Sequence, residues 1–171
     1  MSRWRAGDEI ELAVESLGAA GDGVASTLEG RIYLPDALPG ERWRVRLAER
    51  LPEGWRAEPL ACLVPQPRAE PVCPHFGRCG GCRLQHLPRA AYADFKRDRI
   101  VRALERRGLP AASVTAAAIA PLASRRRLRL KIARGPGELQ LGLRRRGAHE
   151  LERMTVCPIA CPELAGILAP L

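Results

Sequence analysis

The chain has 171 residues, of which 46% are hydrophobic and 27% charged, and this balance excludes a chain that is disordered throughout. Its formal net charge is +9, and because only Lys96 and Lys131 are lysines, 26 of the 28 basic residues are arginines (28 − 2). Arginine pairs well with phosphate, so the charge favours a polyanionic partner; the alternative is that the arginines reflect the base composition of the genome.

No segment has the pattern of a signal peptide or a membrane span. The start, "MSRWRAGDEIEL", has no apolar stretch behind its charges, and the longest mostly apolar run, 111–123, is too short to cross a bilayer. We therefore expect a cytoplasmic protein without membrane contact. In that compartment, cysteines are more often ligands, catalysts or buried thiols than disulfides.

Residues 1–64 are predicted to form a small all-β domain. In "EIELAVES", Ile10, Leu12 and Val14 alternate with glutamates, which indicates a half-buried strand. "RWRVRLAE" alternates in the same way, with arginines on its outer face. "GRIYLP" and "WRAEPLACLV" add strands, and glycine-rich or proline-containing turns separate them. Several short strands with such turns are typical of a small β-barrel of the oligonucleotide-binding (OB) type.

A linker and a helix follow this domain. "PQPRAEPV", residues 65–72, holds three prolines and is predicted to be the linker to a second domain, residues 73–171. A helix is expected from Pro88 to about Arg107, with Gly108 placed to end it. Its basic residues lie off an apolar stripe formed by Tyr92, Phe95, Ile100, Ala103 and Leu104.

The second domain is predicted to contain a β-hairpin with one basic face. "RRRLRLKIA", residues 125–133, alternates strictly, "RGPG" supplies a turn, and "ELQLGLRRR" alternates back. A strand face of one charge sign is costly unless a polyanion meets it. "HELERMTV" adds a strand that leads to Cys157. The candidate contacts for such a polyanion are Arg125, Arg126, Arg127, Arg129, Lys131, Arg144, Arg145 and Arg146.

The expected fold is therefore mostly β with one or two helices. A small N-terminal OB-like barrel precedes a cysteine-bearing segment and a small α+β central domain.

The segment "CPHFGRCGGCRLQH" places Cys73, Cys79 and Cys82 at C-x5-C-x2-C spacing. A fourth ligand would come from Cys157 or Cys161, of which Cys157 follows a strand-like run and precedes a proline. Four cysteines suit either zinc or a [4Fe–4S] cluster. The asymmetric spacing favours the larger cluster over zinc, and buried free thiols are a third interpretation.

The remaining candidate side chains carry weaker signals. Cys62 lies in the apolar run "LACLV" and is predicted to be part of the core. His75 and His86 flank the cysteines and are expected to be polar loop residues, with a hydrogen bond near sulfur as the alternative. No Ser-His-Asp arrangement, phosphate-binding glycine motif or H-E-x-x-H motif is present, so no catalytic residue is predicted.

The order of the motifs closely resembles that of one family. The motifs are the β-domain, "CPHFGRCGGCRLQH", "FKRDRIVRALERRG", "SRRRLRLK", "LQLGLRRRGAHEL" and "VCPI". The resemblance is to the N-terminal half of the bacterial 5-methyluridine RNA methyltransferases, which act on large-subunit rRNA or on tRNA. The resemblance runs through essentially the whole chain and implies that the barrel is a TRAM domain.

The resemblance also implies site residues. It places Arg125, Arg126 and Arg127 in a basic motif near the RNA, although that motif usually begins with an aromatic where this chain has Ser124. It makes a cluster strongly preferred over zinc. The implied [4Fe–4S] ligands are Cys73, Cys79, Cys82 and Cys157.

The family's catalytic half is a C-terminal doubly wound domain that binds S-adenosylmethionine and supplies a cysteine nucleophile and a carboxylate base. This chain stops at Leu171, so the resemblance implies that it binds RNA and a cluster but does not methylate alone. We expect a monomer that binds RNA, rRNA more than tRNA, and not DNA. The alternatives are a stand-alone basic RNA-binding module with a structural metal, iron–sulfur or zinc, and a zinc-bearing domain that contacts protein.

Overall fold

The chain folds mostly as β-structure, which confirms the predicted fold class. The computed structural model describes residues 4–111, 113–115, 117–134 and 139–168. The N-terminal sheet contains β1 (Glu9–Ala13), β2 (Ser16–Leu17), β3 (Gly23–Thr27), β4 (Gly30–Leu34), β5 (Arg42–Leu51) and β6 (Gly54–Val64). The second sheet contains β7 (Lys131–Arg134), β8 (Leu139–Arg144) and β9 (Leu151–Arg153). The helices in these described ranges are α1 (Arg89–Glu105) and α2 (Pro162–Gly166).

The N-terminal sheet has the strand order β1-β5-β6-β4-β3-β2, with β4 and β6 parallel and the other neighbours antiparallel. Alternation sets which side chains face inward: Val45 and Leu47 are fully buried on either side of exposed Arg46. Gly54 is needed where β4 and β6 meet, because a Cβ there would lie 1.8 Å from the carbonyl oxygen of Arg31. Closure of this sheet into an OB-like barrel stays a prediction.

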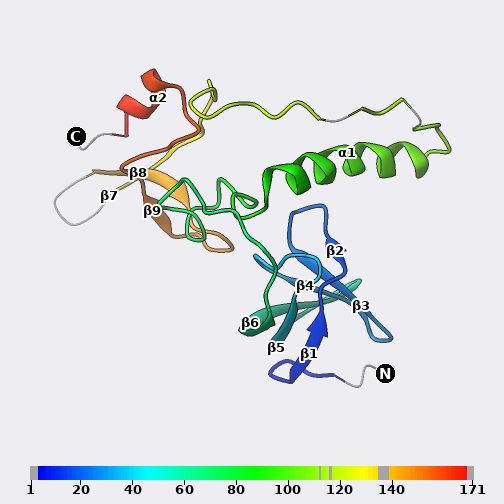
Figure 1. The fold of residues 1–171 in the computed structure, drawn as a ribbon. Coiled ribbons are helices and arrows are strands. Elements are labelled where there is room, and N and C mark those ends of the chain that lie inside the picture. The colour runs from blue at the N-terminus through cyan, green and yellow to red at the C-terminus, as the bar shows by residue number, and fades with distance from the viewer. Residues whose placement is uncertain (1–3, 112, 116, 135–138, 169–171) are drawn as a thin grey trace.

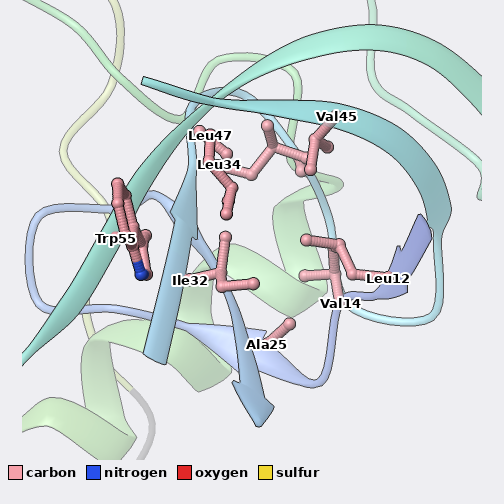
Figure 2. Close-up of a cluster of buried hydrophobic side chains, with 10 residues drawn as sticks. Leu12, Val14, Ala25, Ile32, Leu34, Val45, Leu47 and Trp55 are labelled. Atoms are coloured by element: carbon pink, nitrogen blue, oxygen red, sulfur yellow. The ribbon is translucent and has the colours of Figure 1, made fainter. Parts of the chain in front are cut away.

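Side chains from β1, β3, β4, β5 and β6 pack into one core (Figure 2). Its members are Leu12, Val14, Ala25, Ile32, Leu34, Ala37, Val45, Leu47, Trp55 and Ala57. Burial of a Val, Leu or Ile side chain contributes about 1.5–3 kcal/mol, so this cluster is the main source of stability for the N-terminal sheet. The prediction that Cys62 belongs to the core was wrong. Burial along β6 ends at Ala57, and the exposed Cys62 lies beyond it.

Helix α1 begins after Pro88 and ends before Arg106, close to the predicted bounds. Its apolar stripe does not face a core, since none of its residues is buried. Arg99 Nη1 donates to the carbonyl oxygen of Ala19 at 2.8 Å, which ties the helix to the turn between β2 and β3 (Figure 1). Neither helix in the described part of the chain has the length and apolar character that a membrane crossing requires.

The second sheet is antiparallel, in the order β7-β8-β9, and the predicted hairpin of β7 and β8 is confirmed by their pairing. Most of its predicted turn, "RGPG", lies outside the described residues. β7 is shorter than the predicted run, because residues 125–130 precede the ladder and Arg125 forms an isolated bridge with Ala160.

A second core lies against this sheet. Its buried members are Cys79, Met154, Cys157, Ala160 and Leu168. Leu128 and Leu130 pack against it as the alternation predicts, but the third apolar residue of that run, Ile132, is 70% exposed. The cysteine-bearing segment contributes to this core and lies beside the second sheet (Figure 1).

Candidate metal centre and basic surface

The four predicted ligands line one cavity, although they come from two distant parts of the chain. Cys73, Cys79 and Cys82 lie in the segment between β6 and α1, and Cys157 lies between β9 and α2. Cys79 and Cys157 are buried. Cys161, the competing candidate, precedes α2 and does not line this cavity.

The rest of the cavity wall is mostly apolar. Leu128, Leu143, Met154, Pro158 and Ile159 contribute to it. The Gly81 N–H donates to Cys79 Sγ at 3.3 Å. A Cβ on Gly81 would lie 3.0 Å from Leu143 Cδ1, so glycine lets the backbone approach the sulfur. The wall therefore excludes water and offers a hydrogen bond to a thiolate.

Two of these thiols, those of Cys73 and Cys79, have raised pKa values. Burial raises the pKa of Cys73 and of Cys79, and the charges of neighbouring cysteines raise both further. Backbone N–H groups of His75 and Phe76 act in the opposite direction on the pKa of Cys73. Within the described ranges, no group of three or more His, Cys, Asp or Glu side chains is arranged to hold a metal ion.

The cysteine segment is hydrogen-bonded to the end of β8. The Gly80 N–H donates to the carbonyl oxygen of Arg144, and the Arg146 N–H to that of Arg78, both at 2.9 Å. Cys79 and Arg145 form an isolated antiparallel bridge between these contacts. The segment that carries three candidate ligands is therefore joined to the second sheet where β8 ends.

A buried carboxylate lies behind the cavity. Glu152, on β9, is 5% exposed and accepts hydrogen bonds from Arg78 Nε at 2.8 Å and Arg145 Nε at 3.2 Å. The hydrogen bond from Arg78 is the main reason that the pKa of Glu152 falls to about 2. Because the carboxylate is ionised and can only accept, His75 Nδ1 donates to it across 3.1 Å.

His75 and His86 are both buried, which corrects the expectation that they are polar loop residues. His75 lines the cysteine cavity and is held by Glu152. His86 packs against the ring of Phe76, with 5.4 Å between ring centroids, and burial lowers its pKa.

The predicted RNA contacts line two surface pockets. Arg125, Arg126 and Arg127 line the first. The second, called here the basic pocket, contains the other five together with glycines of the cysteine segment. The side chains that give it its charge are Arg83, Arg129, Lys131, Arg144, Arg145 and Arg146, and His149 also lines it.

These arginines differ in how far they are already paired. Arg145 lies 3.3 Å from Glu150 and 3.2 Å from Glu152, and Arg146 pairs with Asp36 of the N-terminal unit. The other six predicted contacts form no ion pair with any residue that the structure describes: Arg125, Arg126, Arg127, Arg129, Lys131 and Arg144.

The chain matches no protein-family model. It is 40% identical over 156 residues to an uncharacterized RNA methyltransferase of Mesorhizobium japonicum. It is 38% identical over 168 residues to a protein of Halomonas elongata, and 35% identical over 166 residues to one of Pectobacterium atrosepticum. Both are named 23S rRNA (uracil(1939)-C(5))-methyltransferase RlmD.

The chain is a homologue of bacterial RNA methyltransferases. These alignments cover 91%, 94% and 95% of the chain, which confirms the family that the motifs indicated. The chain spans about a third of the length of these relatives, with 36%, 34% and 37% of each one matched.

Some site residues of this RNA methyltransferase homologue were missed from the sequence. Glu152 sits in "HELERMTV", and two of its three partners, His75 and Arg78, come from the distant cysteine segment. Arg83 and His149 line the basic pocket and belong to neither alternating strand. The position of Arg83 beside Cys82 was the one available signal.

Proposed function

We propose that this chain is the RNA-binding, [4Fe–4S]-carrying part of an S-adenosylmethionine-dependent RNA uridine C5-methyltransferase that acts on rRNA rather than tRNA. One observation carries this proposal: the backbone of the cysteine segment is hydrogen-bonded to residues Arg144–Arg146, which line the basic pocket. The names of the relatives from Halomonas elongata and Pectobacterium atrosepticum support the substrate class.

The donor set suits a [4Fe–4S] cluster held by Cys73, Cys79, Cys82 and Cys157. Four thiols on one mostly apolar cavity, with an N–H group directed at a sulfur, match what protein-bound clusters require. When bound, the cluster supplies a four-point link between the cysteine segment and the strand that leads to Cys157. The protein's own part is to exclude water and to hold the sulfurs in place.

Anaerobic purification tests the cofactor. We expect brown protein with iron and sulfide near four of each per chain, in line with four thiolate ligands on one cluster. Cys161→Ser should keep this content, and Cys157→Ser should lose it. Colourless protein with stoichiometric zinc and no iron would refute the cluster.

RNA binding is proposed to use the unpaired basic residues. Their guanidinium groups and the Lys131 ammonium would contact phosphates while a loop is splayed for base recognition. Affinity for a hairpin RNA should fall with salt, and Arg127→Gln should reduce the slope of log affinity against log salt by about one unit. Glu150→Gln, a change on an exposed acidic residue, is a control that should not reduce that slope.

Methyl transfer itself is proposed to need residues beyond these 171. Uracil C5 is a poor methyl acceptor until a nucleophile adds to the ring, and this sequence holds no phosphate-binding glycine motif for a nucleotide-like cofactor. Labelled S-adenosylmethionine incubated with the chain and a uridine-containing RNA should leave the RNA unlabelled. Labelling by the isolated chain would overturn this part of the proposal.

A further inference from the structure

We infer that Arg146 is a positioning residue that fixes the N-terminal sheet to the cysteine segment, and not an RNA contact. The inference refines the proposed RNA-binding set and therefore rests in part on the proposed function. Its structural half stands without RNA. The side chain of Arg146 is 13% exposed, whereas that of neighbouring Arg145 is 48% exposed.

The guanidinium of Arg146 contacts three separate parts of the molecule. Nη1 donates to Asp36 Oδ1 in the turn between β4 and β5. Nη2 donates to the carbonyl oxygen of Cys82 at 3.2 Å. The face of the group lies 5.7 Å from the ring centroid of Phe76. One side chain therefore joins the N-terminal sheet, a candidate ligand and an aromatic ring of the cysteine segment.

Asp36, the carboxylate partner of Arg146, has a backbone conformation that suits its position in the turn between β4 and β5. Asp36 has a φ of 59°, in the left-handed region that few side chains other than Asp and Asn adopt. A second arginine–carboxylate pair lies in the same region. Arg68, in the 65–72 segment that leads to the cysteines, forms hydrogen bonds of 3.0 and 2.8 Å to buried Glu41. The charges of both pairs act on the buried His86. A third arginine–carboxylate pair, Arg83 with Asp22 at 3.5 Å, also joins the cysteine segment to the N-terminal sheet.

Nη1 and Nη2 of Arg146 already donate to Asp36 and to the Cys82 carbonyl oxygen, and Nε is buried, so an RNA phosphate would compete with these contacts for the guanidinium. The charge-assisted hydrogen bond to Asp36, in which the Arg146 side chain is 13% exposed and that of Asp36 38% exposed, opposes such an exchange. Arg129, in the same pocket, forms no ion pair with the described residues and is free to meet a phosphate.

Substitution of Arg146 by lysine distinguishes a phosphate contact from a positioning role. Lysine binds phosphate as a point charge, but it lacks the planar fork that reaches two acceptors while stacking on a ring. A phosphate contact should therefore tolerate Arg146→Lys, and a positioning role should not. Asp36→Asn tests the other partner, since asparagine also accepts a left-handed backbone.

The experiment measures amide hydrogen exchange and RNA affinity in the same set of variants. We expect Arg146→Lys and Asp36→Asn each to speed exchange of the Gly80 and Arg146 amides about tenfold or more, while amides of β5 keep their rates. Arg129→Lys is the matched control and should leave the junction amides unchanged. Unchanged junction exchange in Arg146→Lys would overturn the inference.

The RNA arm uses a hairpin RNA with uridine in its loop. Arg129→Gln should reduce the salt slope by about one unit, whereas Arg146→Lys should preserve it. A slope reduced by one unit in Arg146→Gln, with junction exchange intact, would make Arg146 a phosphate contact and overturn the inference. If wild-type chain binds no RNA, the proposed function fails, and the exchange rates alone still decide the role of Arg146.

Discussion

At the scale of single residues, Glu152 is the most consequential side chain outside the cysteines. It is almost fully buried and is ionised through its contacts with His75, Arg78 and Arg145. Two of these partners lie in the cysteine segment and one follows β8. Loss of its charge would therefore release the back of the cavity and the base of the basic pocket together.

We predict a pH-dependent contribution from Glu152 to stability. Its pKa is about 2 in the fold against 4.5 as the ordinary value, so the unfolded chain takes up the proton first as pH falls. The contribution is complete above about pH 4.5 and is lost as pH falls toward 2. It amounts to about 2–3 kcal/mol. Glu152→Gln should lack this dependence and lose about 2–4 kcal/mol at pH 7.

Urea unfolding, followed through the methyl signals of Met154 and Leu141, measures this effect in the second core. Glu150→Gln is the matched control, because the Glu150 side chain is 73% exposed and its ion pair with Arg145 contributes little. Equal losses in the two variants would contradict a special role for Glu152.

At the scale of elements, alternation predicted strands well where one face meets a core. Val45 and Leu47 were assigned correctly because β5 lies over the N-terminal core along its middle. The same rule failed for Ile132, since the second core ends before that residue, and for Cys62, since β6 extends past its core. Periodicity predicts which side chains of a strand share a face. How far along the strand that face is covered by a core depends on residues that are distant in sequence.

The sequence grouped the four candidate cysteines, which line one cavity, but it did not reveal what surrounds them. Cys73, Cys79 and Cys82 are close in sequence, so spacing grouped them, and the family resemblance favoured Cys157 over Cys161 as the fourth candidate ligand. The junction of Arg146 with Asp36 joins residues 110 positions apart and has no local signature. Such pairs are set by tertiary packing, which no window of sequence reveals.

The contact between the cysteine segment and β8 depends on a small residue. A Cβ at Gly80 would lie 2.9 Å from the carbonyl oxygen of Arg144, so Gly80→Ala must push the backbones apart. We expect a loss of about 1–3 kcal/mol in the second core and a lower iron content. Gly166→Ala in α2, where a Cβ meets nothing within 4 Å, is the control and should be neutral or slightly stabilising. Equal iron content in both variants would contradict the prediction.

At the scale of the whole molecule, the chain has two cores that share no members. Trp4, Trp43 and Trp55 all belong to the N-terminal unit, whereas Met154 belongs to the second core. Tryptophan fluorescence and the Met154 methyl signal therefore report on the two units separately. Arg146 and Arg68 couple the two units, together with the contacts of Arg83 with Asp22 and of Arg99 with Ala19.

Loss of one ligand should affect the two units unequally. In Cys73→Ser, metal binding and folding of the second unit are lost together, because the site forms only in the folded state. We expect the Met154 signal to show an unfolded or heterogeneous second unit, while tryptophan fluorescence keeps a cooperative transition within about 1 kcal/mol of the wild type. Cys62→Ser is the control and should leave both probes unchanged. Equal loss by both probes would show that the units unfold as one.

The 74 residues between Cys82 and Cys157 also have a consequence for synthesis on the ribosome. Every residue of the N-terminal core lies within the first 57, so that unit can fold early. At about 5–20 residues per second, Cys157 is made roughly 4–15 seconds after Cys82. During that interval the nascent chain carries three of the four candidate ligands without the fourth. Assembly of the proposed cluster on all four thiols would therefore have to wait until Cys157 has been made.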